Sequence, residues 1–267
     1  MVLFRSLVCL IFTASGLLAA TAFPQLSLPK GANATWATPP GEAVPATARF
    51  DVDAKGGVWF LPAPRILVRA DGLGLVLDQG ARDLIFSKEG LRVSSDTIAG
   101  PLQLKKLKSG WTAKIKSQLV LPSAAWRLAK GGPDAVVSFG WDEATNQSVV
   151  VRLRDRRKVL EWPERVLAAE GTQDAWFLAT PSGVQRVSRQ GASSFWGTLP
   201  GGVSSLAWVE GAGLAVAGPQ GAALFTSPGK RLPLVKSLSP RVRALGPDLY
   251  ILLPEFGGVL KITGLGR

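Results

Sequence analysis

The chain has 267 residues, of which 46% are hydrophobic and 19% charged, so its apolar content excludes disorder for most of its length. Its formal charge of +12 favours weak attraction to polyanions or anionic membrane surfaces. Histidine is absent and Cys9 is the only cysteine. His-based catalytic triads are therefore excluded, and a form without Cys9 also lacks a cysteine nucleophile and a disulfide.

Residues 1–22 have the features of an export signal. Arg5 precedes an apolar stretch from Leu7 to Ala20, and Ala20-Thr21-Ala22 has the A-x-A pattern of a cleavage site. The stretch is short for a membrane span. We expect cleavage before Phe23, which removes Cys9, and a secreted or periplasmic protein. An uncleaved N-terminal anchor is the alternative.

Residues 23–48 are expected to contain a strand and a linker. The segment 24–29 (Pro-Gln-Leu-Ser-Leu-Pro) has the length of a short strand, and residues 30–48 are rich in Gly, Ala, Thr and Pro. We expect the second part to connect the strand to the next domain, residues 49–267.

Residues 49–267 repeat a pattern of four short strands. In each unit a first strand precedes an apolar run such as Ala175–Leu178, and two further strands follow after polar or Gly/Pro turns. Four strands per repeat is typical of a β-propeller blade. The units are expected to start near Arg49, Asp83, Ala125, Val166, Ser204 and Val242.

The predicted fold is therefore all-β: a single β-propeller of about six four-stranded blades. The last unit reaches Arg267 after only three strands, so the N-terminal strand is expected to close the ring, with residues 24–29 beside 258–263. Five or seven blades, or a pair of β-sandwiches, are the alternatives.

One segment carries a family resemblance. Residues 174–187 (Asp-Ala-Trp-Phe-Leu-Ala-Thr-Pro-Ser-Gly-Val-Gln-Arg-Val) resemble the repeat of bacterial regulator-type and streptogramin-lyase-type β-propellers. The resemblance implies the propeller fold and says little about activity, because this fold hosts many functions. Enzymes of the streptogramin-lyase type use histidine, which this chain lacks, so the resemblance implies no catalytic residue here.

Two segments are strongly basic, and we call them together the basic rim. If the second and third units are neighbours, these segments form one positive patch on the outside of the ring. An acidic protein, an anionic lipid or a glycan phosphate would bind there. The alternative is a solvated strand face that prevents edge-to-edge aggregation. The members are Lys105, Lys106, Lys108, Lys114, Lys116, Arg152, Arg154, Arg156, Arg157 and Lys158.

Other recurrent residues are expected to be structural. Asp134, Asp174 and Asp248 precede equivalent strands, where a carboxylate can fix a turn. Large aromatic residues at one position of each unit, such as Trp59 and Trp176, are expected to fill the core between blades.

The sequence favours an exported, non-catalytic propeller that serves as a protein-binding scaffold in the cell envelope, with no cofactor and no metal. Binding of anionic envelope polymers or lipid headgroups through the basic rim is one alternative. A hydrolase or lyase that uses only carboxylates in the central channel is the other. Nucleic acid is not an expected partner, because the chain has an export signal and no nucleic-acid-binding motif. The acids expected on innermost strands are Asp51, Asp53, Asp83, Glu170 and Glu210.

Overall fold

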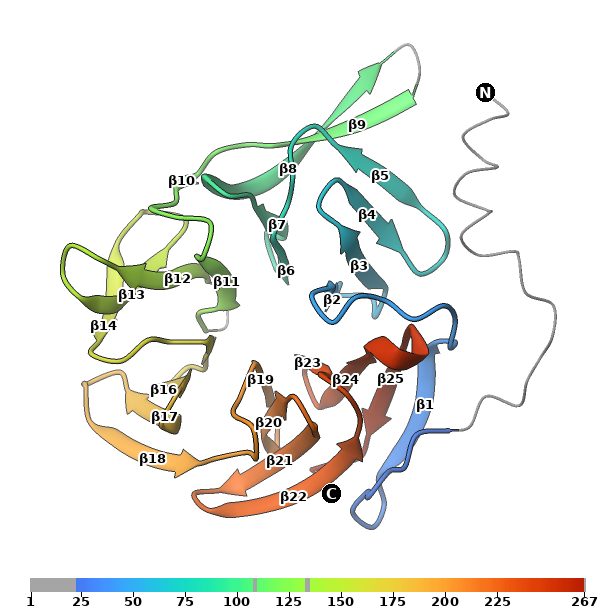
Figure 1. Ribbon diagram of the computed structural model, residues 1–267, viewed down its shortest axis with the longest axis vertical. Coiled ribbons are helices and arrows are strands. Elements are labelled where there is room, and N and C mark those ends of the chain that lie inside the picture. The colour runs from blue at the N-terminus through green and yellow to red at the C-terminus, as the bar shows by residue number, and fades with distance from the viewer. Residues whose placement is uncertain (1–22, 108–109, 133–134, 267) are drawn as a thin grey trace.

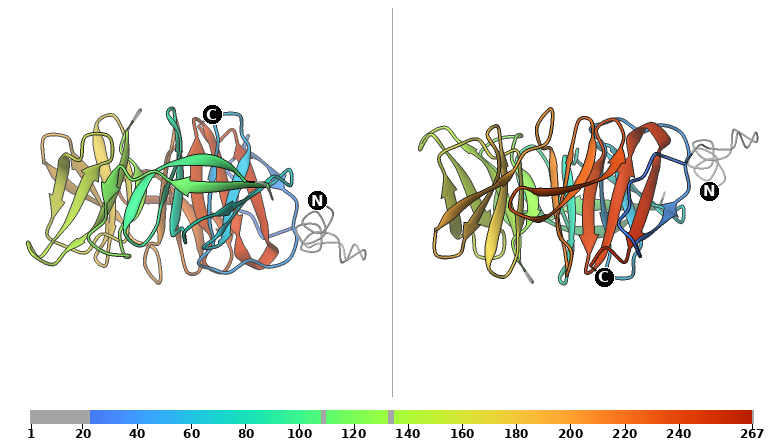
Figure 2. Two further views of the ribbon diagram at one scale, coloured as in Figure 1. Left: turned by 90° about the horizontal axis from the view of Figure 1, so that it is seen from above. Right: turned by 90° about the horizontal axis from the view of Figure 1, so that it is seen from below.

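The computed structural model describes residues 23–107, 110–132 and 135–266, with only the backbone described at residues 104–107, 110 and 111 (Figure 1). The predicted export signal, residues 1–22, lies outside these ranges. The described part is a ring of β-sheets around a common axis, with one short 3-10 turn, η1 (Pro254–Phe256), and we call the region along this axis the central channel. Seen from the edge, the ring is a flat disc with two end faces (Figure 2).

Four sheets have four strands each, as the repeat predicts, and in each of them neighbouring strands are antiparallel. The third group contains β11 (Arg127–Lys130), β12 (Val136–Asp142), β13 (Gln147–Arg152) and β14 (Lys158–Trp162). The fourth contains β15 (Ala168–Gly171), β16 (Ala175–Thr180), β17 (Gly183–Ser188) and β18 (Ser193–Gly197). The fifth contains β19 (Ser205–Val209), β20 (Gly213–Gly218), β21 (Gly221–Ser227) and β22 (Lys230–Lys236).

The first two groups are joined into one nine-stranded sheet, which the repeat does not predict. The joint is a parallel pair in which Val76 lies opposite Thr112 and Leu77 opposite Ala113. The first group contains β2 (Arg49–Val52), β3 (Val58–Ala63), β4 (Ile66–Arg69) and β5 (Gly74–Leu77). The second contains β6 (Asp83–Ser87), β7 (Gly90–Ser94), β8 (Ile98–Leu107), β9 (Gly110–Ile115) and β10 (Leu119–Val120).

The last group is completed by the N-terminal segment. It contains β23 (Arg241–Leu245), β24 (Asp248–Leu253), β25 (Gly258–Thr263) and, as its outermost strand, β1 (Asn33–Thr38). Closure by the N-terminal strand is thus confirmed, and the two segments lie side by side in Figure 1. The ring takes in chain that precedes the predicted boundary at Arg49.

The prediction that residues 24–29 close the ring was wrong. Residues 24–29 do not pair with 258–263; Leu26 forms an isolated bridge with Val235, and the backbone N–H of Ser27 donates to the carbonyl of Leu234 at 2.9 Å. The closing strand lies within the predicted linker, where Thr38 accepts a hydrogen bond from the N–H of Val259 at 2.8 Å. Trp36 packs against the buried cluster of the last two sheets, as do Leu26 and Leu28.

The innermost strands surround the channel. β2, β6, β11, β15, β19 and β23 contact one another in that order, and β23 returns to β2. Buried apolar side chains fill the space between neighbouring sheets, as expected for the aromatic residues. Phe177, for example, stacks on Trp208 of the next sheet at a centroid distance of 5.3 Å and meets Trp196 edge-on at 4.8 Å.

Candidate functional site

The wall of the central channel carries polar and charged side chains in two layers. Residues at alternate positions of a strand face the same side, so the first and third residues of an innermost strand share one side of it. The first layer contains Arg49, Asp83, Arg127, Ser205 and Arg241. The second layer contains Asp51, Glu170 and Arg243.

Three acids of the channel join neighbouring innermost strands. Asp51 accepts a hydrogen bond from the N–H of Phe86 at 2.6 Å, and Asp83 accepts one from the N–H of Leu128 at 3.0 Å. The carboxylate of Glu170 accepts from the N–H of Trp208 at 3.4 Å. Each acid uses a carboxylate oxygen for this purpose, so all three have a structural role in the ring.

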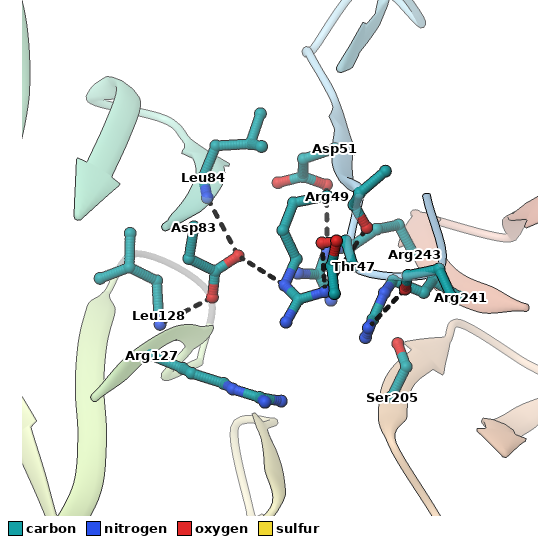
Figure 3. Close-up of polar contacts among 12 residues, drawn as sticks. Thr47, Arg49, Asp51, Asp83, Leu84, Arg127, Leu128, Ser205, Arg241 and Arg243 are labelled. Carbon is teal, nitrogen blue, oxygen red and sulfur yellow. Dashed lines mark hydrogen bonds and ion pairs between the residues drawn. The ribbon is translucent and has the colours of Figure 1, made fainter. Parts of the chain in front are cut away.

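Four arginines converge at the end of the channel where the innermost strands begin, and we call them the arginine mouth: Arg49, Arg127, Arg241 and Arg243. Figure 3 shows their side chains entering the same space from three strands. They line a cavity of about 30 Å³, with Asp83 as the one acid. A cavity of this size holds about two water molecules, or one carboxylate group.

The carboxylates of the channel only partly neutralise the arginine mouth. The Nε of Arg49 lies 3.9 Å from Asp83, and the Nε of Arg243 lies 3.7 Å from Asp51. Arg127 donates to the carbonyl of Leu167 at 3.2 Å, and Arg241 donates to that of Ala46 at 3.0 Å. Neither Arg241 nor Arg243 has a hydrogen-bond partner for its Nε among the described residues.

The crowding of positive charge perturbs Arg241 most. Burial, together with the nearby guanidinium groups of Arg49, Arg127 and Arg243, lowers the pKa of Arg241 to about 9. Burial also lowers the pKa of Arg49, although Asp83 opposes this shift. The mouth therefore has a surplus of positive charge that an anion would stabilise.

Glu170 is the acid of the channel with a strongly shifted pKa. It is 6% exposed, and burial raises its pKa to about 7, while Lys130 and Arg243 oppose the shift. The ammonium group of Lys130 donates to the carbonyl of Ala244 at 2.6 Å. A carboxyl group with a pKa near 7 can both accept and donate a proton at neutral pH.

The acids predicted for the channel are partly confirmed. Asp51, Asp83 and Glu170 are buried in its wall. Asp53 instead fixes the turn after β2, where it accepts from the N–H of Gly57 at 2.9 Å and from the indole of Trp59 at 3.0 Å. Glu210 is exposed just after β19.

The recurrent aspartates are paired differently from the prediction. Asp248 forms an ion pair with Lys261 of the next strand, at 2.7 Å, and thus does not act only through its own turn. The negative charge of Asp174 favours the charged form of Arg189, which raises the arginine's pKa, although burial lowers it more. Asp134 lies outside the described residues.

The two segments of the basic rim are brought together in part. The Nε of Arg156 donates to the carbonyl of Gln118 at 2.8 Å, which places the turn after β13 against the chain that follows Lys116. Lys114, Lys116, Arg154, Arg156, Arg157 and Lys158 are exposed. Lys105 and Lys106 lie in β8, and Lys108 lies outside the described residues.

Acidic neighbours neutralise part of the rim. Arg152 forms an ion pair with Asp155 at 2.6 Å, and Lys158 forms one with Glu161 at 2.5 Å. In the described part of the chain no helix is long and apolar enough to cross a membrane. The expected partners, an envelope protein or an anionic polymer or lipid headgroup, remain predictions.

Comparison with solved structures identifies the fold. The chain is similar to the PQQ-bound aldose sugar dehydrogenase of Streptomyces coelicolor, with a TM-score of 0.59, 10% identity, and coverage of 89% of this chain and 99% of that one. It is also similar to a candidate gluconolactonase, with a TM-score of 0.58, 14% identity, and coverage of 88% and 93%. A third is regucalcin of Agrobacterium tumefaciens, a calcium-binding protein, with a TM-score of 0.57, 12% identity, and coverage of 84% and 94%.

These likenesses show a β-propeller, which confirms the predicted fold and the resemblance at the level of the repeat. No protein-family model and no curated protein sequence matches the chain.

The comparisons contradict the prediction of a non-catalytic scaffold. The structures to which the chain is similar include a sugar dehydrogenase and a candidate gluconolactonase, which are enzymes by name. The prediction that the protein is not an enzyme was therefore wrong. It gave the missing histidine and cysteine more weight than the alternative of a hydrolase or lyase that uses only carboxylates, although carboxylates and arginines can also carry catalysis.

The channel does not fit calcium or PQQ, the groups named in two of these structures. Among the described residues no cluster of three or more acids, histidines or cysteines could hold a metal ion. Four guanidinium groups at the mouth would repel a divalent cation. The cavity of about 30 Å³ is also far too small for a three-ring cofactor.

Proposed function

We propose that the protein is an enzyme that hydrolyses a small lactone or ester to a carboxylate product, with the ester group in the arginine mouth and the rest of the substrate outside this cavity. The observation that carries this proposal is the arginine mouth, where four guanidinium groups share one cavity with a single carboxylate, that of Asp83. Guanidinium groups bind carboxylates through paired hydrogen bonds, and the Nε atoms of Arg241 and Arg243, which lack a hydrogen-bond partner among the described residues, supply donors for this.

The same arginines can bind the carboxylate product and stabilise the negative charge that forms during the reaction. Attack of water on an ester carbonyl places negative charge on its oxygen, and donors fixed in advance stabilise that charge. The mouth meets this requirement, because its cations are held by the ring and are incompletely neutralised. Carboxylate and oxyanion would thus be recognised by one set of groups.

Glu170 is the proposed general base. It follows Ala168, a residue that lines the mouth cavity, on the same face of β15 and about 7 Å further along the channel. With a pKa of about 7, Glu170 can accept the proton of the attacking water and then donate it to the leaving alkoxide. The carbonyl–oxygen bond to the alkoxide breaks, so that an ester gives a carboxylic acid and an alcohol, and a lactone gives a single hydroxy acid.

The comparisons support lactones as the first substrates to test. A gluconolactonase acts, by its name, on a sugar lactone, and a candidate enzyme of that name shares this fold. At 14% identity the likeness supports the fold and the choice of substrates; the residues proposed here come from the channel itself.

The test is hydrolysis of a panel of sugar lactones, simple lactones and aryl esters by residues 23–267, followed with a pH indicator. Glu170→Gln should lower kcat at least about 100-fold, because a general base typically contributes that much. Arg241→Met should raise KM and thereby lower kcat/KM. The matched controls are the exposed residues of the same types, Glu210→Gln and Arg231→Met, which should leave both parameters unchanged. The proposal is wrong if no member of the panel is hydrolysed, or if Glu170→Gln is fully active.

A further inference from the structure

A second cavity lies at the end of the ring opposite the arginine mouth, and we call it the rim pocket. It has a volume of about 250 Å³. The turns that follow the innermost strands β11 and β15 contribute Gly131 and Thr172 to its wall. The mouth is formed where innermost strands begin, so the two cavities lie at opposite ends of the channel wall. The arginines of the rim pocket are Arg92, Arg152, Arg154 and Arg189.

Three of the four arginines are held in place by contacts within the protein. Arg92 is 7% exposed and is bound by Glu89, whose carboxylate lies 2.6 Å from its guanidinium group. Arg189 donates to the carbonyls of Gly131, at 2.8 Å, and Thr172, and its guanidinium lies 4.3 Å from the ring centroid of Trp176. Arg152 is paired with Asp155. The pocket is thus preorganised.

The fourth arginine differs from the other three. Arg154 is exposed, lines the same pocket, and has no hydrogen bond or ion pair among the described residues. Glu89 and Asp155 pair with Arg92 and Arg152, and the negative charge of Asp174 acts on Arg189, so Arg154 is the pocket arginine with no acid beside it among the described residues. An anion that enters the pocket would meet Arg154, which has no partner among the described residues, beside arginines of fixed geometry.

We propose that the rim pocket binds a small molecule through a phosphate or sulfate group. Such a group carries more oxygens than a carboxylate and can accept from several guanidinium groups at once. The volume of about 250 Å³ also admits the rest of a small ligand, whereas the mouth admits only a carboxylate-sized group. This site is independent of the proposed hydrolysis.

The site gives the basic rim a specific role. Arg152 and Arg154 belong to both the rim and the pocket, while Arg156 and Arg157 belong to the rim alone. Attraction to the rim as a whole would involve all four residues alike. Binding in the pocket singles out Arg154 and should survive moderate salt better, because a partly buried site is screened less than exposed charges are.

The experiment is isothermal titration calorimetry of residues 23–267 with four probes. Three carry a charged group, namely glucose 6-phosphate, glucose 6-sulfate and inorganic phosphate, and glucose is the uncharged probe. We expect binding of the phosphate- and sulfate-bearing sugars and none of glucose. Arg154→Met should weaken their binding about tenfold, because it removes a hydrogen bond to a charged group. Binding of inorganic phosphate as tight as that of the sugar phosphate would identify the free ion as the ligand.

Arg157→Met is the matched control, since Arg157 is exposed in the same turn and does not line the pocket. It should leave affinity unchanged. Equal weakening by Arg154→Met and Arg157→Met would overturn the proposal in favour of general attraction to the rim. Absence of binding by all four probes would also overturn it. Neither result bears on lactone hydrolysis, whose assay uses uncharged substrates and variants of the channel.

Discussion

The carboxylate of Asp83 accepts a hydrogen bond from the backbone N–H of Leu128, 45 residues further along the chain, and so joins the innermost strands of two neighbouring sheets. The same carboxylate accepts from the N–H of Leu84 and lies near Arg49. Asp51 and Glu170 form equivalent links to the strands that follow them. The ring is therefore held by buried acids as well as by apolar packing.

Asp83→Ala should destabilise the protein by about 3 kcal/mol, because it leaves the buried N–H of Leu128 without its acceptor and removes the carboxylate that faces Arg49. Urea unfolding at pH 7 measures the change. Asp96→Ala is the control, since its ion pair with Arg82 is more than half exposed and should contribute less than about 1 kcal/mol. Equal destabilisation by the two changes would contradict the role of Asp83.

Glu170 should give the protein a distinctive dependence of stability on pH. Its pKa in the folded state is about 7, against 4.5 for an unperturbed glutamate, so between these values the folded protein keeps a proton that the unfolded chain has released. The free energy of unfolding should therefore fall as pH rises from 4.5 to about 7, by up to about 3 kcal/mol, and level off above that.

Unfolding in urea at pH 5, 6, 7 and 8 tests this prediction. The chain has no histidine, so no other type of side chain ordinarily titrates in the middle of this range. Glu170→Gln should abolish the fall, and Glu210→Gln should retain it. A slope that Glu170→Gln leaves unchanged would show that another group binds the proton.

Closure of the ring should depend on Trp36. Its ring contacts Phe256 at a centroid distance of 6.3 Å, and it packs against the buried cluster of the last two sheets. Trp36→Ala should lower the free energy of unfolding by about 2 to 4 kcal/mol. Phe23→Ala is the comparison, because Phe23 contacts the same indole but is 49% exposed, and it should cost less than half as much.

Cleavage of the export signal remains a prediction from the sequence. Expression of the full chain in a bacterial host, followed by mass spectrometry of the purified protein, should give a mature form that begins at Phe23. Ala22→Lys should block cleavage, because the site requires a small residue there. Recovery of the uncleaved chain from the wild-type gene would instead support an N-terminal anchor.

The sequence predicted what depends on local pattern. β2 and β6 begin at Arg49 and Asp83, as predicted, because the start of a short apolar strand is encoded in the residues beside it. The parallel pair of β5 and β9 was missed, because it joins residues 36 positions apart, such as Val76 and Thr112, whose pairing no local signal specifies.

The candidate site could be predicted only in part. Acids on innermost strands were expected from the strand pattern, and Asp51, Asp83 and Glu170 lie there. The arginine mouth was missed, because its members are scattered along the chain and converge only when the ring closes. Basic residues that are close together in the sequence predicted the basic rim as the binding site instead. The available signal was an arginine at the first position of β2, β11 and β23.

The parallel pair of β5 and β9 also bears on how this ring can change. In a propeller of separate sheets, gene duplication or loss can add or remove one unit at any junction. Here the first two groups share a hydrogen-bonded seam, so an insertion between Leu77 and Asp83 would separate strands that must pair. We therefore expect the first two groups to be gained or lost only together. A change in the number of units is expected at another junction of the ring.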